Sequence, residues 1–99
     1  MWSKFMDGET IGTVGSEGGE ILIDELHDNG GRITLEKTTR LYAITCGIFG
    51  VMVHTAFAGE DEYMEKYEAM KSELGEFLSK DTTSAEDLDF LNYFTDKFW

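Results

Sequence analysis

Few residues of this chain have the chemistry of a catalytic group, and their spacing is not typical of a catalytic site. His27 and His54 are the only histidines, and Cys46 is the only cysteine. A nucleophilic cysteine needs a neighbouring base, but a hairpin turn at residues 47–50 would bring His54 nearer to Ala43 than to Cys46. A free cysteine inside an apolar strand is usually an inert small hydrophobic residue. We therefore assign no catalytic residue and expect a non-enzymatic protein.

The sequence also predicts neither a metal nor a cofactor. No pair of possible ligands shows the i, i+4 helical spacing or the Cys-x-x-Cys spacing of a metal site. Residues 24–31 resemble a calcium-binding loop only superficially, because Glu36 is out of register for the last ligand. One alternative stays open: His54, Cys46 and Tyr67 could line a small-molecule or enzymatic pocket between a sheet and its helices.

Acidic residues outnumber basic residues by 20 to 8, which gives a formal net charge of −12. Residues 60–99 contain 12 of the acids and 4 of the bases. Phosphate backbones and anionic membrane surfaces repel such a chain, so we expect neither nucleic acid nor a membrane as its partner. A basic protein is the electrostatic complement. The single cysteine is typical of a reducing compartment, and residues 1–10 lack the apolar core of a signal peptide, so we expect a cytoplasmic protein.

The elements that would position these groups are organised around residues 41–58, which contain no Asp, Glu, Lys or Arg. This length just reaches the range of a membrane-spanning helix. However, two threonines and a histidine lower its hydrophobicity, and its β-branched and aromatic residues favour strands. Residues 47–50 begin and end with glycine and offer a turn. We predict two buried strands, residues 41–46 and 51–57, and keep a membrane span and a buried helix as alternatives.

A second hairpin is predicted nearer the N-terminus. Asn29-Gly30 is a strong hairpin signal, because both residue types tolerate the positive φ of a type I′ turn. Residues 20–26 lead into this turn with Ile21 and Ile23 on one face, and residues 32–38 lead out of it. Before a glycine-rich turn at residues 15–19, four residues are predicted to form a further short strand: Thr10, Ile11, Thr13 and Val14.

From residue 60 onwards the spacing of apolar residues is helical. Gly75 lies inside the first helix, where it costs about 1 kcal/mol relative to alanine but permits close packing. Thr83 and Glu86 are predicted to form a capping box for a second helix, and Ser84 with Asp87 is an equally good frame. The apolar face of the first helix consists of Tyr63, Tyr67, Met70, Leu74, Phe77 and Leu78, and that of the second of Leu88, Leu91, Phe94 and Phe98, with Phe90 beside it.

The predicted fold class is α+β, an antiparallel meander sheet of four to five strands followed by two C-terminal helices packed on one face. Residues 1–99 form a single α+β domain, with the β meander in residues 1–58 and the two helices in residues 60–99. The apolar residues on the other face of the sheet then need a cover. Trp2, Phe5 and Met6 could provide it, or a second copy of the chain could, as a homodimer through the sheet.

The leading hypothesis for function is a small acidic protein-binding module, such as an inhibitor or immunity-type protein for a basic partner. The acidic outer face of the two helices would bind this partner. Tyr93 lies among carboxylates and would serve as an aromatic anchor. The predicted partner-binding residues are Glu65, Glu68, Glu76, Glu86, Asp89, Tyr93 and Asp96.

Overall fold

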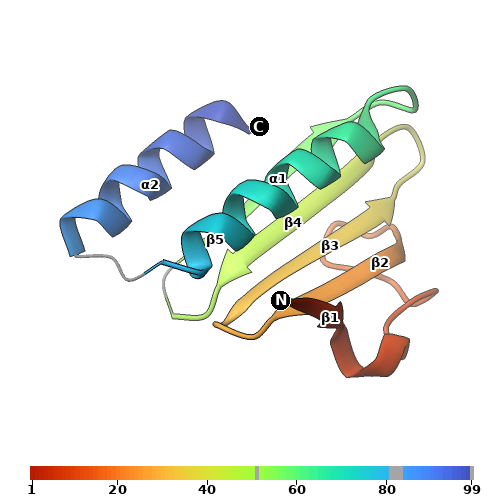
Figure 1. Cartoon of the computed structure of the whole chain (residues 1–99). Helices are drawn as coiled ribbons and strands as arrows, with labels where there is room; N and C mark the ends of the chain where they lie inside the picture. Colours follow the sequence, from red (N-terminus) through yellow and green to blue (C-terminus); the bar gives the residue numbers. More distant parts are fainter. Residues whose placement is uncertain (51, 81–83, 99) are drawn as a thin grey trace.

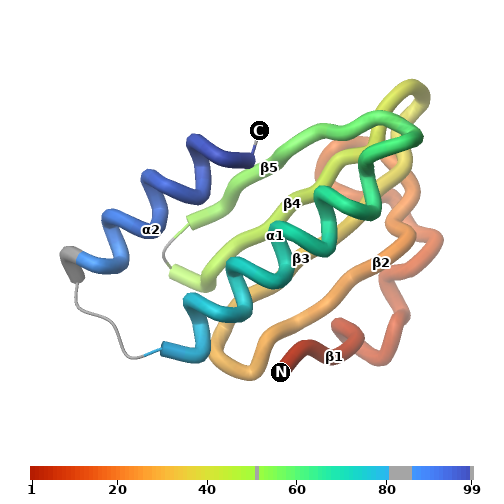
Figure 2. Tube along the Cα trace, turned by 45° about the horizontal axis from the view of Figure 1, so that its top comes forward, coloured from red at the N-terminus to blue at the C-terminus, as the bar shows by residue number. Residues whose placement is uncertain are grey.

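The computed structural model describes residues 1–50, 52–80 and 84–98. It contains one antiparallel sheet whose five strands follow one another in chain order, which confirms the predicted meander (Figure 1). Both helices follow the last strand and lie on the same face of the sheet (Figures 1 and 2). The strands are β1 (Trp2–Lys4), β2 (Glu20–His27), β3 (Gly31–Lys37), β4 (Tyr42–Ile48) and β5 (Met52–Ala58), and the helices are α1 (Tyr63–Leu78) and α2 (Ser84–Lys97).

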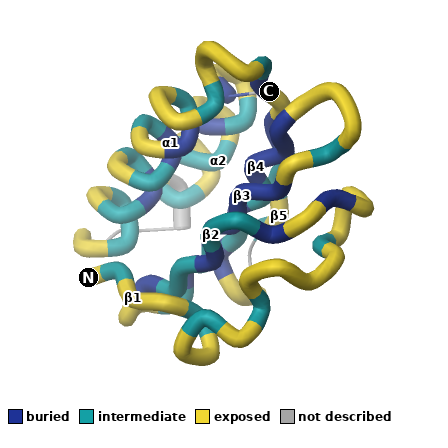
Figure 3. The backbone as a smooth tube through the Cα atoms, turned by 90° about the vertical axis from the view of Figure 1, so that its right-hand side faces the viewer, coloured by how far each residue is buried: buried dark blue, intermediate teal, exposed yellow. Residues whose placement is uncertain are grey.

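The hydrophobic core lies between the sheet and the helices, where the buried parts of β3, β4 and α1 meet (Figure 3). In an antiparallel sheet, directly paired residues share a face. Ile33 pairs with Cys46, and Leu35 pairs with Ile44, so all four face the helices. Each large apolar side chain buried here contributes about 1.5–3 kcal/mol. The helices add Tyr67, Met70, Leu74, Phe94 and Phe98 to this core.

The uncharged stretch forms the β4–β5 hairpin, as predicted from its composition. Ile48 pairs with Met52, so β4 extends two residues further than predicted, into the turn predicted at residues 47–50. Val51, where the second strand was predicted to begin, lies outside the described residues. None of the helices in the described part of the chain is long and apolar enough to cross a membrane.

The β2–β3 hairpin is also confirmed, but two of its details differ from the prediction. His27 pairs with Gly31, so residues 28–30 form a three-residue loop. Within this loop only Gly30 has a positive φ, 91°, whereas a type I′ turn needs two such residues. In addition, an irregular register between Ile21 and Ile23 reverses the facing of the strand. Ile21 therefore pairs with Glu36 on the open face, whereas Ile23 faces the helices.

The N-terminal residues form a strand that the sequence did not predict, and Trp2 does not belong to the predicted cover of the open face. Trp2 pairs with His27 at the edge of the sheet, and its indole contacts Gly75 of α1 on the helix-covered face. Phe5 lies on the open face, where its ring contacts the Arg32 guanidinium. The strand predicted nearby is reduced to an isolated bridge between Val14 and Glu20.

The apolar face of α1 is as predicted, but that of α2 is rotated. Leu88 is 59% exposed, so its predicted place in the core is wrong. Phe90 instead packs against α1, with its ring stacked on that of Phe77 at 4.0 Å. The hydroxyl of Thr83 was predicted to cap this helix, and that residue lies outside the described residues.

Candidate functional site

A hollow of about 170 Å³ lies between α1 and α2. Its apolar wall is the stacked pair Phe77 and Phe90, and its polar groups include the carboxylates of Glu73 and Glu76. This volume is several times the ~30 Å³ that a water molecule occupies in the liquid, which leaves room for one polar side chain of another protein. We call this site the interhelical hollow; it is lined by Glu73, Glu76, Phe77, Lys80, Phe90 and Tyr93.

Tyr93 connects the two helices through a polar network at the edge of the interhelical hollow. Its hydroxyl donates a hydrogen bond to Glu73 and accepts one from Lys97, whose Nζ lies 3.0 Å away. Lys97 also forms an ion pair with Glu73, at 2.8 Å. Partial burial raises the pKa of Glu73, but the hydrogen bonds from Lys97 and Tyr93 outweigh it, and the pKa lies below its usual value. Glu73 is thus a carboxylate that stays ionised.

The structure brings together only part of the predicted partner-binding surface. Glu76 and Tyr93 share the interhelical hollow. Glu68 lines a different hollow beside Trp2, and Glu65 lies next to Lys66 further along α1. The other three predicted carboxylates are exposed on α2: Glu86, Asp89 and Asp96.

The nearest partners of Tyr93 were not those expected from the sequence. Tyr93 was predicted to lie among carboxylates of its own helix, whereas its hydroxyl bonds to Glu73 of α1. Glu73 and Lys80 were not predicted to belong to the site. Helical periodicity places Glu73 on the polar face of α1, but only the packing of α2 brings that face close to Tyr93.

The three pocket candidates lie within or against the core, and two of them have almost no exposed surface. Tyr67 is fully buried, and Cys46 is 1% exposed. The Tyr67 hydroxyl donates to Glu25, which also receives a hydrogen bond from Lys71. Burial raises the pKa of the Tyr67 hydroxyl, and the bond to Glu25 raises it further, so it remains protonated.

Cys46 and His54 are direct neighbours across the β4–β5 hairpin, which corrects the predicted register. This proximity does not create a reactive thiol, because burial raises the pKa of Cys46 to about 12. The ring of His54 is committed elsewhere, since its Nε2 contacts the backbone oxygen of Phe98 in a close hydrogen bond. This pair therefore serves packing and the attachment of the C-terminal end of α2.

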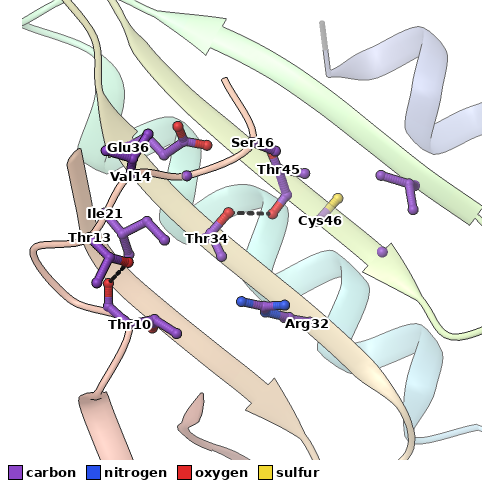
Figure 4. Close-up of a pocket in the computed structure, with 13 residues that line it drawn as sticks. Thr10, Thr13, Val14, Ser16, Ile21, Arg32, Thr34, Glu36, Thr45 and Cys46 are labelled. Carbon is purple, nitrogen blue, oxygen red and sulfur yellow. Dashed lines mark hydrogen bonds between the residues drawn. The ribbon is translucent and has the colours of Figure 1, made fainter. Parts of the chain in front are cut away.

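A second hollow, of about 350 Å³, lies on the open face, where the N-terminal segment crosses β2 and β3 (Figure 4). Asp24 accepts two hydrogen bonds from Arg32, at 2.9 and 2.6 Å, and one from Thr10 at 2.8 Å. The bond to Asp24 raises the pKa of Arg32. The Asp24 carboxylate thus finds its hydrogen-bond donors within the chain, which is typical of a contact that stabilises the fold.

Glu36 ties the glycine-rich turn to the same face. Its carboxylate accepts hydrogen bonds from the backbone N–H groups of Glu17 and Gly19, both at 3.1 Å. A Cβ on Gly15 would lie 2.4 Å from the Glu36 carboxyl carbon, so a larger residue there would displace the carboxylate. The turn predicted at residues 15–19 is present, and it wraps a buried carboxylate.

No group of three or more His, Cys, Asp and Glu side chains in the described ranges is arranged to hold a metal ion. Comparison with known proteins gives no family model, no curated protein and no solved structure that matches this chain. Its function is therefore inferred from its own charge distribution and geometry.

Proposed function

We propose that this chain is a non-enzymatic protein-binding module whose two helices bind a basic protein, in the manner of an inhibitor or immunity-type protein. The observation that carries the proposal is the separation of charge between the two parts of the molecule. Residues 60–99 contribute 12 acids against 4 bases, while residues 41–59 contain no Asp, Glu, Lys or Arg. Complementary charge accelerates association and selects among partners.

The interhelical hollow supplies a specific anchor point on this surface. An arginine of the partner could stack on the Phe77–Phe90 pair and bond to Glu76 or Glu73. Lys80 is 3.5 Å from Glu76, and its side chain is 61% exposed. Exposed ion pairs contribute little, so an incoming arginine replaces this lysine at small cost. Tyr93 at the rim, 49% exposed, adds an aromatic contact of the type found at interface hot spots.

The test uses two variants with equal net charge and different charge placement. One neutralises acids of the helices, Glu65→Gln/Glu76→Gln/Asp89→Asn. The matched control neutralises exposed acids of the N-terminal segment and β2, Glu9→Gln/Glu17→Gln/Glu20→Gln. Each is immobilised beside the wild type, exposed to cell extract at low salt, and eluted with a salt gradient.

The proposal predicts a basic protein that the wild type and the control retain and the helix variant does not. Titration calorimetry with that purified protein then gives the Kd, and Tyr93→Ala weakens binding about tenfold or more, as expected for a hot-spot residue. If the two variants lose the protein equally, net charge alone determines binding; if all three proteins retain the same set, the neutralised helix acids do not bind it. Either result contradicts the proposed surface.

A further inference from the structure

The open face of the β4–β5 hairpin is an exposed surface without formal charge, in a chain where 28% of the residues are charged. On this face β4 presents its small residues, and β5 presents Val53 and Phe57, which are 80% and 44% exposed. We call this surface the open strip; it consists of Thr45, Gly47, Val53, Thr55 and Phe57, while Ala43, which shares this face, is fully buried.

The polar groups of the open strip are already partly satisfied within the chain. Thr45 and Thr55 are direct partners across the hairpin, and their hydroxyl oxygens are 3.1 Å apart. Thr34 of β3 continues this row and donates to the backbone oxygen of Thr45 at 3.3 Å. Burying hydroxyls that bond to each other costs less than burying unpaired ones. The strip can therefore lose its contact with water at low cost.

Large apolar side chains also remain exposed at both ends of the hairpin. Leu41 is 44% exposed and Phe49 is 62% exposed. Together with Val53 and Phe57 they make four exposed large apolar residues in the described part of the hairpin. Apolar surface of this kind on a soluble domain usually marks an interaction site.

We infer that the open strip binds a second copy of this chain, face to face about a two-fold axis. The distribution of charge selects this occupant. A basic protein finds no carboxylate on the strip to pair with, and an anionic membrane surface repels a chain of net charge −12. Two copies joined here bring uncharged surfaces together, and both acidic helix layers lie on the outside, where their mutual repulsion is smallest.

The resulting assembly is a β-sandwich with helices on its two outer faces. Sheets packed face to face lie about 10 Å apart, with strands crossing at about 30°. Val53 pairs with Gly47 near the turn end of the hairpin and is the most exposed residue of the strip, so a change there acts directly on the contact. The helical surface assigned to the basic partner stays accessible in both copies, so the two associations are independent.

Sedimentation equilibrium of the full chain from about 1 to about 200 µM tests this inference. The wild type and the matched control Val53→Thr are expected to reach twice the 11.2 kDa mass of the chain. Val53→Glu would bury an unpaired charge, so its dimer Kd rises at least about tenfold. Since Val53 is exposed in the single chain, the circular dichroism of this variant and its Tm at concentrations below the wild-type dimer Kd should be unchanged.

Salt and a second variant distinguish this face-to-face contact from a charge-driven complex and from pairing along the β5 edge. Added salt screens the repulsion between two acidic copies and strengthens the dimer, whereas it weakens binding of a basic protein. Thr45→Lys, in β4 and away from the free edge of β5, also dissociates the dimer. A wild type that stays at 11.2 kDa, a dimer that resists Val53→Glu, or a dimer weakened by salt would each overturn the inference. Dissociation by Val53→Glu but not by folded Thr45→Lys would indicate pairing along the β5 edge and overturn the face-to-face geometry.

Discussion

Asp24 is a buried carboxylate on the open face of the sheet. Its side chain has no exposed surface, and it accepts two hydrogen bonds from Arg32. Removing the arginine leaves a buried carboxylate without its cation. We expect Arg32→Met to lower the free energy of unfolding by about 3 kcal/mol. The exposed Arg40 is the matched control, and Arg40→Met should change it by less than about 0.5 kcal/mol.

Urea unfolding at neutral pH, followed by circular dichroism, measures both variants. The double variant Asp24→Asn/Arg32→Met removes the buried charge together with its partner, and it should recover part of the loss. Equal small losses for Arg32→Met and Arg40→Met would show that the Asp24–Arg32 pair is not a structural tie.

Glu73 makes a pH-dependent contribution whose sign follows from its lowered pKa. A carboxylate with a folded-state pKa below its unfolded value stabilises the protein above the unfolded pKa, and the contribution is lost as the pH falls through the folded pKa. Glu73→Gln should therefore be less stable than the wild type at pH 7 by at most about 1 kcal/mol, because water screens this partly exposed pair. The difference should disappear in acid. Thermal unfolding of both proteins across the acidic range measures it, and a difference that stays constant with pH would show that the charge of Glu73 is not responsible.

At the scale of elements, the attachment of β1 to α1 depends on Gly75. A Cβ at this position would lie 2.8 Å from the Trp2 Nε1, so alanine displaces the indole. Gly75→Ala in an exposed helix would gain about 1 kcal/mol of helix propensity. Here we expect the clash to cancel the gain, and we expect the gain to reappear when Trp2→Ala is already present. A double-mutant cycle in urea measures the coupling between the two positions. Additive effects would show that Trp2 does not constrain α1.

Local patterns in the sequence predicted most of these elements, and the exceptions depend on contacts between distant residues. The apolar spacing from Tyr63 to Leu78 predicted the buried face of α1, because helical periodicity is a local property. The irregular register between Ile21 and Ile23 is invisible in the sequence, since an extra residue in one strand shows only against its partner. The site was less predictable: Tyr93 bonds to Glu73, twenty positions away, through the packing of two helices.

At the scale of the whole molecule, the most acidic layer and the uncharged open strip lie on opposite faces of the sheet. The helices carry most of the net charge and cover one face of the sheet (Figure 3), while the open strip on the other face has no formal charge. This separation allows two associations with opposite salt dependence. Binding of a basic protein to the helices weakens with salt, and self-association of the open strip strengthens with it.

Binding of a basic protein to the helical layer at the interhelical hollow can be located residue by residue. The measurement is the backbone amide NMR spectrum of the isotope-labelled chain, titrated with the basic protein that its helix-neutralised variant fails to retain. We expect the largest shifts on residues of α1 and α2 that line the hollow, including Phe77, Phe90 and Tyr93. Largest shifts on the open strip, at Thr45, Val53 or Thr55, would contradict binding at the hollow.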